Sequence, residues 1–302
     1  MQASVIVPVR DGAAHLPALL AALAAQTHAP LEVIVADDGS TDDSVAIAEA
    51  APVVDAVVRS AGRGPGAARN AAAAAARGDV LAFTDADCMP APRWLEAGLA
   101  AMADADLVQG AVAPPRDVAV GPWDRTIRVS TDHGLFETAN LLIRRDLFER
   151  LGGFEPWLQP SDGKELGEDV WLGWRARRAG ARVAFAADAL VHHAVFPREP
   201  AEFVAERARL RFFPEMAARI PELREGFLFR RYFLSRRSAA FDLALAGALV
   251  ARHRPAAALA VLPYARMLAA DGPSQAAVRA AADAVGFAAL AYGSLRARSA
   301  VL

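Results

Sequence analysis

Short runs of apolar residues alternate with amphipathic segments along the first 85 residues of the chain. Four runs that stop at turns or polar clusters predict buried strands, at residues 4–9, 31–36, 53–58 and 79–84. The segments between them have the leucine or alanine spacing of helices, at residues 15–26, 41–50 and 67–77. Alternation of this kind predicts a parallel sheet with helices on both faces, which binds ligands at the carboxyl ends of its strands.

Two helix ends in this half carry their own signals. Ser40 or Thr41 is a suitable N-cap for the helix at 41–50, because either hydroxyl can accept from a free backbone N–H. Gly78 is expected to close the helix at 67–77.

The pattern becomes mixed after Pro92. Helices are expected at 93–103, 145–151 and 168–179, strands at 107–112, 138–143, 182–185 and 189–191, and an irregular segment at 114–131. From about residue 199 onward the pattern is helical throughout. We therefore expect an α/β domain over residues 1–198 and an α-helical region over 199–302.

Composition narrows the class of protein. The net charge of −2 argues against nucleic acid as the main partner, because no overall basic field is present. Cys88 is the sole cysteine, which excludes an intramolecular disulfide and fits a reducing compartment. The first residues predict a strand rather than a signal peptide. The longest largely apolar stretch, residues 239–251, is shorter than the ~20 residues that a spanning helix needs.

Two acidic clusters fall at predicted strand ends. Asp85 and Asp87, one residue apart, suit a hard divalent cation such as Mn²⁺ or Mg²⁺ and a ribose hydroxyl, although such pairs also occur in solvated turns. A cation held there would stabilise a diphosphate leaving group. Asp37 and Asp38 can accept a hydrogen bond from a nucleobase N–H, or can form a turn before the next helix.

Three further motifs are candidates for chemistry. The glycines at 62–66 let the backbone approach a phosphate, and Arg69 can pair with diphosphate oxygens, although a plain loop is an equal alternative. Glu168 and Asp169 open a helix, as a general base or as ordinary first-turn acids. His192 and His193 end a strand; because neighbours on a strand face opposite ways, one imidazole is expected to point into the site as a metal ligand.

Four stretches together resemble the family 2 glycosyltransferases, which have the GT-A fold. They are residues 5–11 (VIVPVRD), 32–44 (EVIVADDGSTDDS), 66–87 (GAARNAAAAAARGDVLAFTDAD) and 138–169, and they occur in the family's order. The resemblance covers residues 4–195. It implies a Rossmann-like nucleotide-binding half at 1–90 and an acceptor half at 91–198, in a non-processive enzyme of bacterial type.

The resemblance implies roles for the donor-side residues. Pro8 and Asp38, with Asp37 beside it, would line the nucleoside pocket, and Arg69 would lie near the diphosphate. Asp85 would approach the ribose or the metal. Asp87 would bind the metal directly, with His193, or His192 if the register shifts by one, as a further ligand.

It also implies roles on the acceptor side. Asp169 would be the general base of an inverting, in-line displacement, and Glu168 would support it or hold the acceptor. Glu137 and Asn140 belong to the stretch that resembles the acceptor-side signature. Trp171 can stack on a sugar ring or pack within its helix.

The implied activity is metal-dependent transfer of a sugar from a nucleotide-diphosphate donor, UDP-linked by default, to a sugar or lipid-linked acceptor of the envelope or an exopolysaccharide. Arg10-Asp11 departs from the family's asparagine, and the polymerases' Gln-X-X-Arg-Trp signature is absent, which favours one sugar per encounter. A nucleotidyltransferase and a non-catalytic nucleotide-sugar-binding scaffold are the alternatives.

Arginines cluster near aromatic residues in the helical region. The arginines are Arg207, Arg209, Arg211, Arg230, Arg231, Arg236 and Arg237, and the aromatic residues near them include Phe212, Phe213, Phe227 and Phe229. They predict either a solvated helix face or a surface for an anionic membrane, extended by residues 239–269 and 276–295. The expected location is cytoplasmic, with peripheral attachment to the inner face of the membrane as an option.

Overall fold

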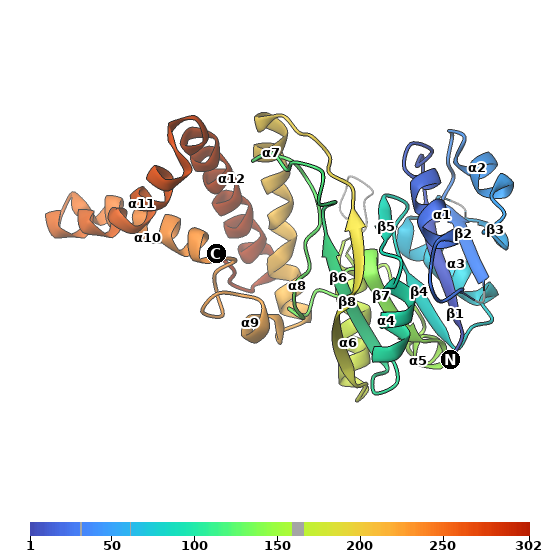
Figure 1. Ribbon diagram of the computed structural model, residues 1–302. Coiled ribbons are helices and arrows are strands. Elements are labelled where there is room, and N and C mark those ends of the chain that lie inside the picture. The colour runs from blue at the N-terminus through green and yellow to red at the C-terminus, as the bar shows by residue number, and fades with distance from the viewer. Residues whose placement is uncertain (31, 61, 159–165) are drawn as a thin grey trace. The chain divides into compact units, whose positions relative to one another are not determined.

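The computed structural model describes residues 1–30, 32–60, 62–158 and 166–302. The chain forms two compact units (Figure 1). Unit 1 contains Met1–Val120 and Arg125–Phe196, and unit 2 contains Gly121–Asp124 and Pro197–Leu302.

Unit 1 is built on an eight-stranded sheet with the order β3-β2-β1-β4-β7-β6-β8-β5. The strands are β1 (Ala3–Val9), β2 (Glu32–Asp37), β3 (Ala56–Arg59), β4 (Val80–Phe83), β5 (Cys88–Pro90), β6 (Leu107–Ala113), β7 (Leu141–Arg144) and β8 (Val183–His193). Strands β1 to β4 pair in parallel, with Val5 opposite Val33 in β2 and Ala82 in β4. The carboxyl ends of β1, β2 and β4 therefore meet at one edge, as the sequence predicts.

The second half of the sheet is mixed. β7 runs antiparallel to both β4 and β6, whereas β6 and β8 are parallel and β5 is antiparallel to β8. The sequence does not predict β5, because three residues are too few to show a period. The two strands expected at 182–185 and 189–191 form one strand, β8, whose register with β6 shifts at Gly110/Ala111. The strand expected at 138–143 begins with a 3₁₀ turn, Thr138–Asn140.

Helices cover both faces of this sheet (Figure 1). They are α1 (Leu16–Ala24), α2 (Ser44–Ala50), α3 (Pro65–Ala75), α4 (Trp94–Ala101), α5 (Arg145–Leu151) and α6 (Glu168–Arg178). Val5 and Val7 of β1 pack with the leucines of α1, while Ile6 packs on the other face with Ala68 and Ala72 of α3. Side chains alternate along the strand, so both faces of a doubly covered sheet must be apolar.

Two predicted helix ends differ from the structure. α2 begins after Asp43 and has no side-chain cap. Ser40 and Thr41 bind Asp11 instead: Ser40 Oγ accepts from the Asp11 N–H at 3.0 Å, and the Thr41 N–H donates to Asp11 Oδ1 at 2.7 Å. The loop after β1 is thereby tied to the loop after β2. Residue 31, at the start of the strand expected at 31–36, lies outside the described residues.

Gly78 does not close α3 in a left-handed conformation, since the helix ends at Ala76 in extended backbone. Gly78 instead allows its backbone to lie close to that of Ser4, because a Cβ on Gly78 would be only 2.6 Å from the backbone nitrogen of Ser4. The Gly78 N–H donates to Ser4 Oγ at 2.8 Å. A glycine is needed here to let the two backbones meet.

Unit 2 is helical. Its elements are α7 (Pro200–Glu206), η2 (Arg207–Phe212), α8 (Phe213–Arg219), α9 (Leu223–Gly226), α10 (Arg236–Ala251), η3 (Pro255–Val261), α11 (Leu262–Asp271) and α12 (Pro273–Ala297). Among the described residues, no helix combines the length and the apolar character that crossing a membrane would need.

Part of the arginine–aromatic cluster of unit 2 is used in internal packing, whereas Arg230, Arg231 and Arg236 are exposed. The guanidinium of Arg207 lies 4.6 Å from the ring of Phe203, and Arg237 forms ion pairs with Asp271 and Asp283. Phe213 packs against the buried cluster that contains Leu290. Arg207, Arg237 and Phe213 therefore contribute to the internal packing of unit 2.

Candidate active site

Arg69 is the central charge of the site at the carboxyl edge of the sheet. It projects from α3 and is only 4% exposed. Its Nη2 lies 2.6 Å from Asp85 Oδ1, and its Nη1 lies 3.4 Å from Glu168 Oε1. Burial acts to lower the pKa of Arg69, but the negative charges of Asp85 and Glu168 outweigh it and the pKa is raised. The guanidinium stays charged and joins the end of β4 to the start of α6.

Asp87 and His193 are brought together by the short strand β5. Cys88 of β5 pairs with His193 of β8, so the preceding Asp87 lies beside the imidazole, with Oδ2 3.6 Å from Nε2. Burial, followed by the charge of Asp85, raises the pKa of Asp87. The pair therefore places one carboxylate oxygen and one ring nitrogen close enough to bind the same metal ion.

The other ring nitrogen of His193 determines which tautomer is favoured. His193 Nδ1 lies 2.7 Å from the backbone oxygen of Ala194, which can only accept a hydrogen bond. In the neutral imidazole the proton is then on Nδ1, and Nε2 presents a lone pair toward Asp87. This is the arrangement in which histidine binds metals.

His192 points away from this pair. Its Nδ1 lies 3.3 Å from the backbone oxygen of Pro114, and its partner in β5 is Met89. Alternation along β8 accounts for the difference between the two histidines.

The donor set fits a divalent cation that is completed by its substrate. In the part of the chain that the structure describes, no three His, Cys, Asp or Glu side chains are grouped closely enough to hold a metal by themselves. Asp85 is hydrogen-bonded to Arg69, which leaves Asp87 and His193 as the protein ligands available to a metal. Mg²⁺ and similar hard cations commonly take one or two protein ligands and fill the remaining positions with phosphate oxygens and water.

Pro8, Asp37 and Asp38, for which the sequence predicts a nucleoside pocket, are all buried. The Asp37 carboxylate accepts from the backbone N–H groups of Gly39 and Ser40, which satisfies it within a turn. Asp38 Oδ2 accepts from the Gly64 N–H at 3.0 Å, while Oδ1 is buried with no partner among the described residues. A buried acceptor without a partner is costly, so Oδ1 marks a position where a ligand N–H would be favoured.

The glycine loop at 62–66 has a visible structural role here. Gly64 adopts a φ of 100°, which side-chain-bearing residues rarely adopt, and its N–H fixes Asp38. The loop therefore orients the carboxylate of Asp38.

Glu168 and Asp169 lie in the first turn of α6, where the helix dipole favours carboxylates. Asp169 Oδ1 accepts from the Val170 N–H at 2.7 Å. Burial, together with the charge of Glu168, raises the pKa of Asp169 well above the usual aspartate value. A carboxylate with a raised pKa is a better proton acceptor than an exposed one.

Glu137 lies near Asp169, since its negative charge contributes to the raised pKa of Asp169. Burial also raises the pKa of Glu137, and its Oε2 is buried with no partner among the described residues. Its Oε1 lies 3.5 Å from His133 Nε2.

Trp171 donates from Nε1 to Glu155 at 2.8 Å, and its ring centre lies 6.4 Å from that of Trp157.

Asn140 does not have the acceptor-binding position expected for it. The side chain is fully buried, and its amide nitrogen donates to the backbone oxygens of Ala111 and Ala189 at 2.8 and 2.7 Å. Its oxygen accepts from Trp94 Nε1 at 2.8 Å. Asn140 therefore joins β6, β8 and α4 inside the core, and we correct its role to a structural one.

Two residues near the site gave no signal in the sequence. The hydroxyl of Thr126 lies 3.4 Å from His193 Nδ1, and His133 contacts Glu137. Both lie in stretches without hydrophobic periodicity, so only their neighbours in space reveal them.

Comparison with known proteins identifies the family. The model of glycosyl transferase family 2 matches residues 4–154. Glycosyltransferase AglE of Haloferax volcanii is 31% identical over 210 residues, which cover 64% of this chain and 67% of that protein. The pre-mycofactocin glycosyltransferase of Mycobacterium tuberculosis is 31% identical over 214 residues, which cover 63% of this chain and 42% of that protein.

Solved structures share the fold. Mannosyltransferase PcManGT from Pyrobaculum calidifontis, in complex with GDP-Man and Mn²⁺, has a TM-score of 0.69 at 23% identity, covering 97% of this chain and 86% of that one. S. aureus TarS 1-349 in complex with UDP has a TM-score of 0.53 at 18% identity, covering 98% of this chain and 91% of that one. With a GT-A architecture and a family model that matches half of its length, the chain belongs to glycosyl transferase family 2.

Proposed function

We propose that the chain transfers a single sugar from a nucleoside-diphosphate sugar to a hydroxyl acceptor with inversion at the anomeric carbon. The observation that carries this proposal is Arg69, which joins Asp85 on the donor side to Glu168 on the acceptor side. Asp169, the general base we propose, follows Glu168 in the chain, and its negative charge also acts on Arg69. Residues 1–90 form the donor half, 91–198 the acceptor half, and 199–302 a helical extension.

The donor is held at its two ends. Asp38 Oδ1, buried and without a partner among the described residues, accepts an N–H of the base, next to Pro8. The buried Arg69 guanidinium pairs with the diphosphate. PcManGT is described with GDP-Man and TarS with UDP, so both nucleotides are candidates, with UDP as our default.

Asp87 and His193 would hold Mn²⁺ or Mg²⁺, in keeping with the Mn²⁺ in the PcManGT complex. A cation bound there offsets the negative charge on the diphosphate as it leaves. Asp85 is oriented by Arg69 toward the ribose.

Transfer is a single displacement. The acceptor oxygen forms a bond to the anomeric carbon as the bond to the diphosphate oxygen breaks, and the diphosphate leaves with the electron pair. Asp169 takes the proton of the acceptor hydroxyl, and Glu168, held by Arg69, positions the acceptor. We assign Glu137, whose charge acts on Asp169, and Trp171, which is in the same helix as Asp169, to acceptor binding.

The acceptor class we propose is a lipid-linked or envelope polysaccharide, reached from the cytoplasmic face of an anionic membrane. The support for a membrane is that most of the large exposed apolar side chains of the described chain are in unit 2, including Leu243, Leu249 and Leu259.

Calorimetric titration tests the donor site. Purified protein is titrated with UDP, GDP and dTDP, each with Mn²⁺ and with EDTA. We expect one nucleotide to bind in a metal-dependent manner and Asp87→Ala to abolish that binding, because it removes the carboxylate ligand. Asp104→Ala, an exposed aspartate away from the site, is the matched control. If folded protein binds none of the three nucleotides, the proposed assignment of the donor site is wrong.

The pH dependence of kcat tests Asp169. The base must be ionised to take a proton, and burial with the charge of Glu168 raises its pKa. Activity is therefore expected to be lost as the pH falls through this raised pKa, well above pH 4, and to be retained at higher pH. A profile measured at saturating donor and acceptor reports this group; an acidic limb at the pKa of an ordinary exposed aspartate would contradict the assignment.

A further inference from the structure

The helices α10 and α11, with η3 between them, form a hairpin in unit 2, residues 236–271, which we call the apolar hairpin. Its inner face is closely packed. Ala240, Ala244 and Tyr264 form a buried cluster, and a Cβ on Gly247 would lie only 2.6 Å from the Cβ of Ala260. The two arms of the hairpin therefore bury their apolar inner surfaces against each other.

The outer surface of the same hairpin is also apolar but is exposed. Leu249 is 63% exposed and Leu259 66%, and three further large apolar side chains are about half exposed: Leu243, Val250 and Leu262. In the described part of unit 1, by contrast, the large exposed apolar residues are Met1 and Val118. A helix that is apolar on all sides is normally covered, and a cluster of exposed apolar side chains of this kind marks an interaction surface.

Between Asp242 and Asp271, the charged side chains of the hairpin are all basic. Residues 243–270 contain no aspartate or glutamate. Arg252, His253 and Arg254 are exposed at the turn between α10 and η3, and Arg266 is exposed on α11. An apolar surface whose neighbouring exposed charges are basic is complementary to an anionic surface.

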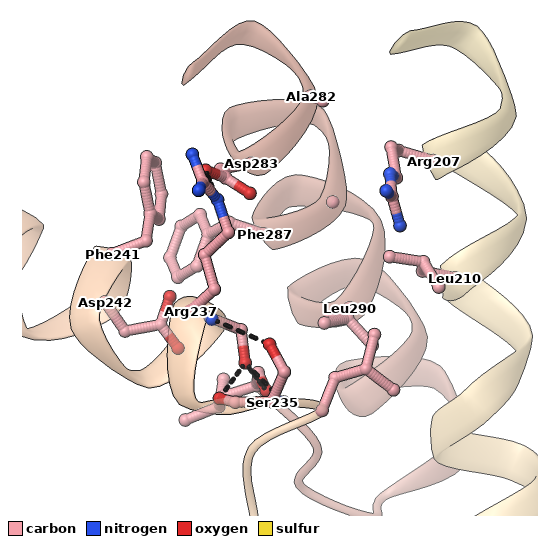
Figure 2. Close-up of a pocket in the computed structure, with 14 residues that line it drawn as sticks. Arg207, Leu210, Ser235, Arg237, Phe241, Asp242, Ala282, Asp283, Phe287 and Leu290 are labelled. Carbon is pink, nitrogen blue, oxygen red and sulfur yellow. Dashed lines mark hydrogen bonds and ion pairs between the residues drawn. The ribbon is translucent and has the colours of Figure 1, made fainter. Parts of the chain in front are cut away.

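The base of the hairpin is held in place by an ion-pair cluster. Arg237 donates to Asp271 at 2.8 Å and to Asp283 of α12 at 2.7 Å, and Tyr264 donates to Asp283 at 2.8 Å. Figure 2 shows Arg237 and Asp283 directed toward one another, with Phe241 and Phe287 beside them. The hairpin is therefore preformed, and its outer surface is presented without further folding.

We propose that the apolar hairpin docks unit 2 on an anionic lipid surface, which extends the proposed function by naming the segment that meets the membrane. The leucines of the outer surface enter the interface between headgroups and acyl chains, and Arg252 and Arg254 pair with the headgroups. The helices lie in the interface, since no described helix is of the kind that spans a bilayer. A second copy of the chain is a poorer occupant, because it would bring the basic turns of two hairpins together.

Co-sedimentation of the full chain with vesicles tests this. Vesicles of phosphatidylcholine alone are compared with vesicles that also contain phosphatidylglycerol, at low and high salt. We expect binding to the anionic vesicles that weakens with salt. The double variant Leu249→Asp/Leu259→Asp should abolish it, and Arg252→Gln/Arg254→Gln should weaken it about tenfold or more. Leu295→Asp, which places the same charge on an 82% exposed leucine of α12, is the matched control and should bind as the wild type does.

Two further measurements separate the outcomes. Thermal unfolding verifies that each variant is folded, and titration with UDP or GDP shows whether the donor site is intact, so failure of docking and failure of the proposed function are distinguishable. Absence of binding to anionic vesicles overturns the proposal, as does equal loss of binding in Leu295→Asp. A wild-type dimer in light scattering that the hairpin variants convert to monomer, without lipid binding, would assign the surface to a second copy instead.

Discussion

Replacing Asp169 by asparagine is expected to lower kcat about 10²- to 10⁴-fold, because the variant keeps the shape of the side chain but cannot take a proton. Binding of the donor nucleotide should be unchanged, since we propose that Asp169 acts on the acceptor and does not bind the donor. Steady-state kinetics with saturating donor and acceptor measure the first effect, and calorimetry measures the second. The loss should be seen in kcat rather than in the affinity for the nucleotide.

The same variant should be more stable than the wild type at neutral pH. Burial and the charge of Glu168 raise the pKa of Asp169, which means that its ionised form is disfavoured in the folded protein. A neutral isostere removes that cost, as expected where activity requires a destabilised group. Asp146→Asn, at an exposed aspartate of α5, is the matched control and should change neither kcat nor Tm appreciably. A kcat for Asp169→Asn within threefold of wild type would exclude Asp169 as the base.

Asn140→Ala is expected to reduce the free energy of unfolding by about 3–5 kcal/mol. The change leaves the oxygens of Ala111 and Ala189 and the Trp94 Nε1–H without their partner inside the core, and an unsatisfied buried group costs about 1–3 kcal/mol. Urea unfolding, followed by tryptophan fluorescence and far-UV circular dichroism, measures the difference.

Asn70→Ala provides the comparison for this effect. Asn70 also binds backbone, through Phe154, but it is only partly buried, so water can replace the lost hydrogen bonds and a smaller cost is expected. If Asn140→Ala unfolds like the wild type and instead raises KM for the acceptor, the structural role assigned to Asn140 is wrong and the acceptor-binding role returns.

The first 90 residues of the fold were predictable from the sequence because their signals are local. Strands of alternating or continuous apolar residues, each followed by a helical period, allow only a doubly covered parallel sheet, and Asp37, Asp38, Asp85 and Asp87 follow its strands. These acids lie at the same edge of the sheet because the strands that they follow are parallel. The family motifs add their order along the chain, which the match over residues 4–154 confirms.

The arrangement of residues 91–198 was less predictable because the order of their strands in the sheet depends on contacts between distant segments. β7 enters the sheet antiparallel, and β5 is too short to show a period, yet β5 determines that His193 rather than His192 faces Asp87. Asn140 lies in a stretch that resembles the acceptor signature, and only its partners in β6, β8 and α4 show that it is enclosed.

The amino-acid sequence by itself determined the α/β class, the acidic strand ends and the helical character of the last hundred residues, because periodicity and turn chemistry act within a few residues of the chain. The tertiary structure alone decided which polar atoms have partners and which apolar faces are covered. Asp38 Oδ1 and the outer leucines of the apolar hairpin have no local sequence signature, since burial and exposure are properties of neighbours that meet only when the chain has folded.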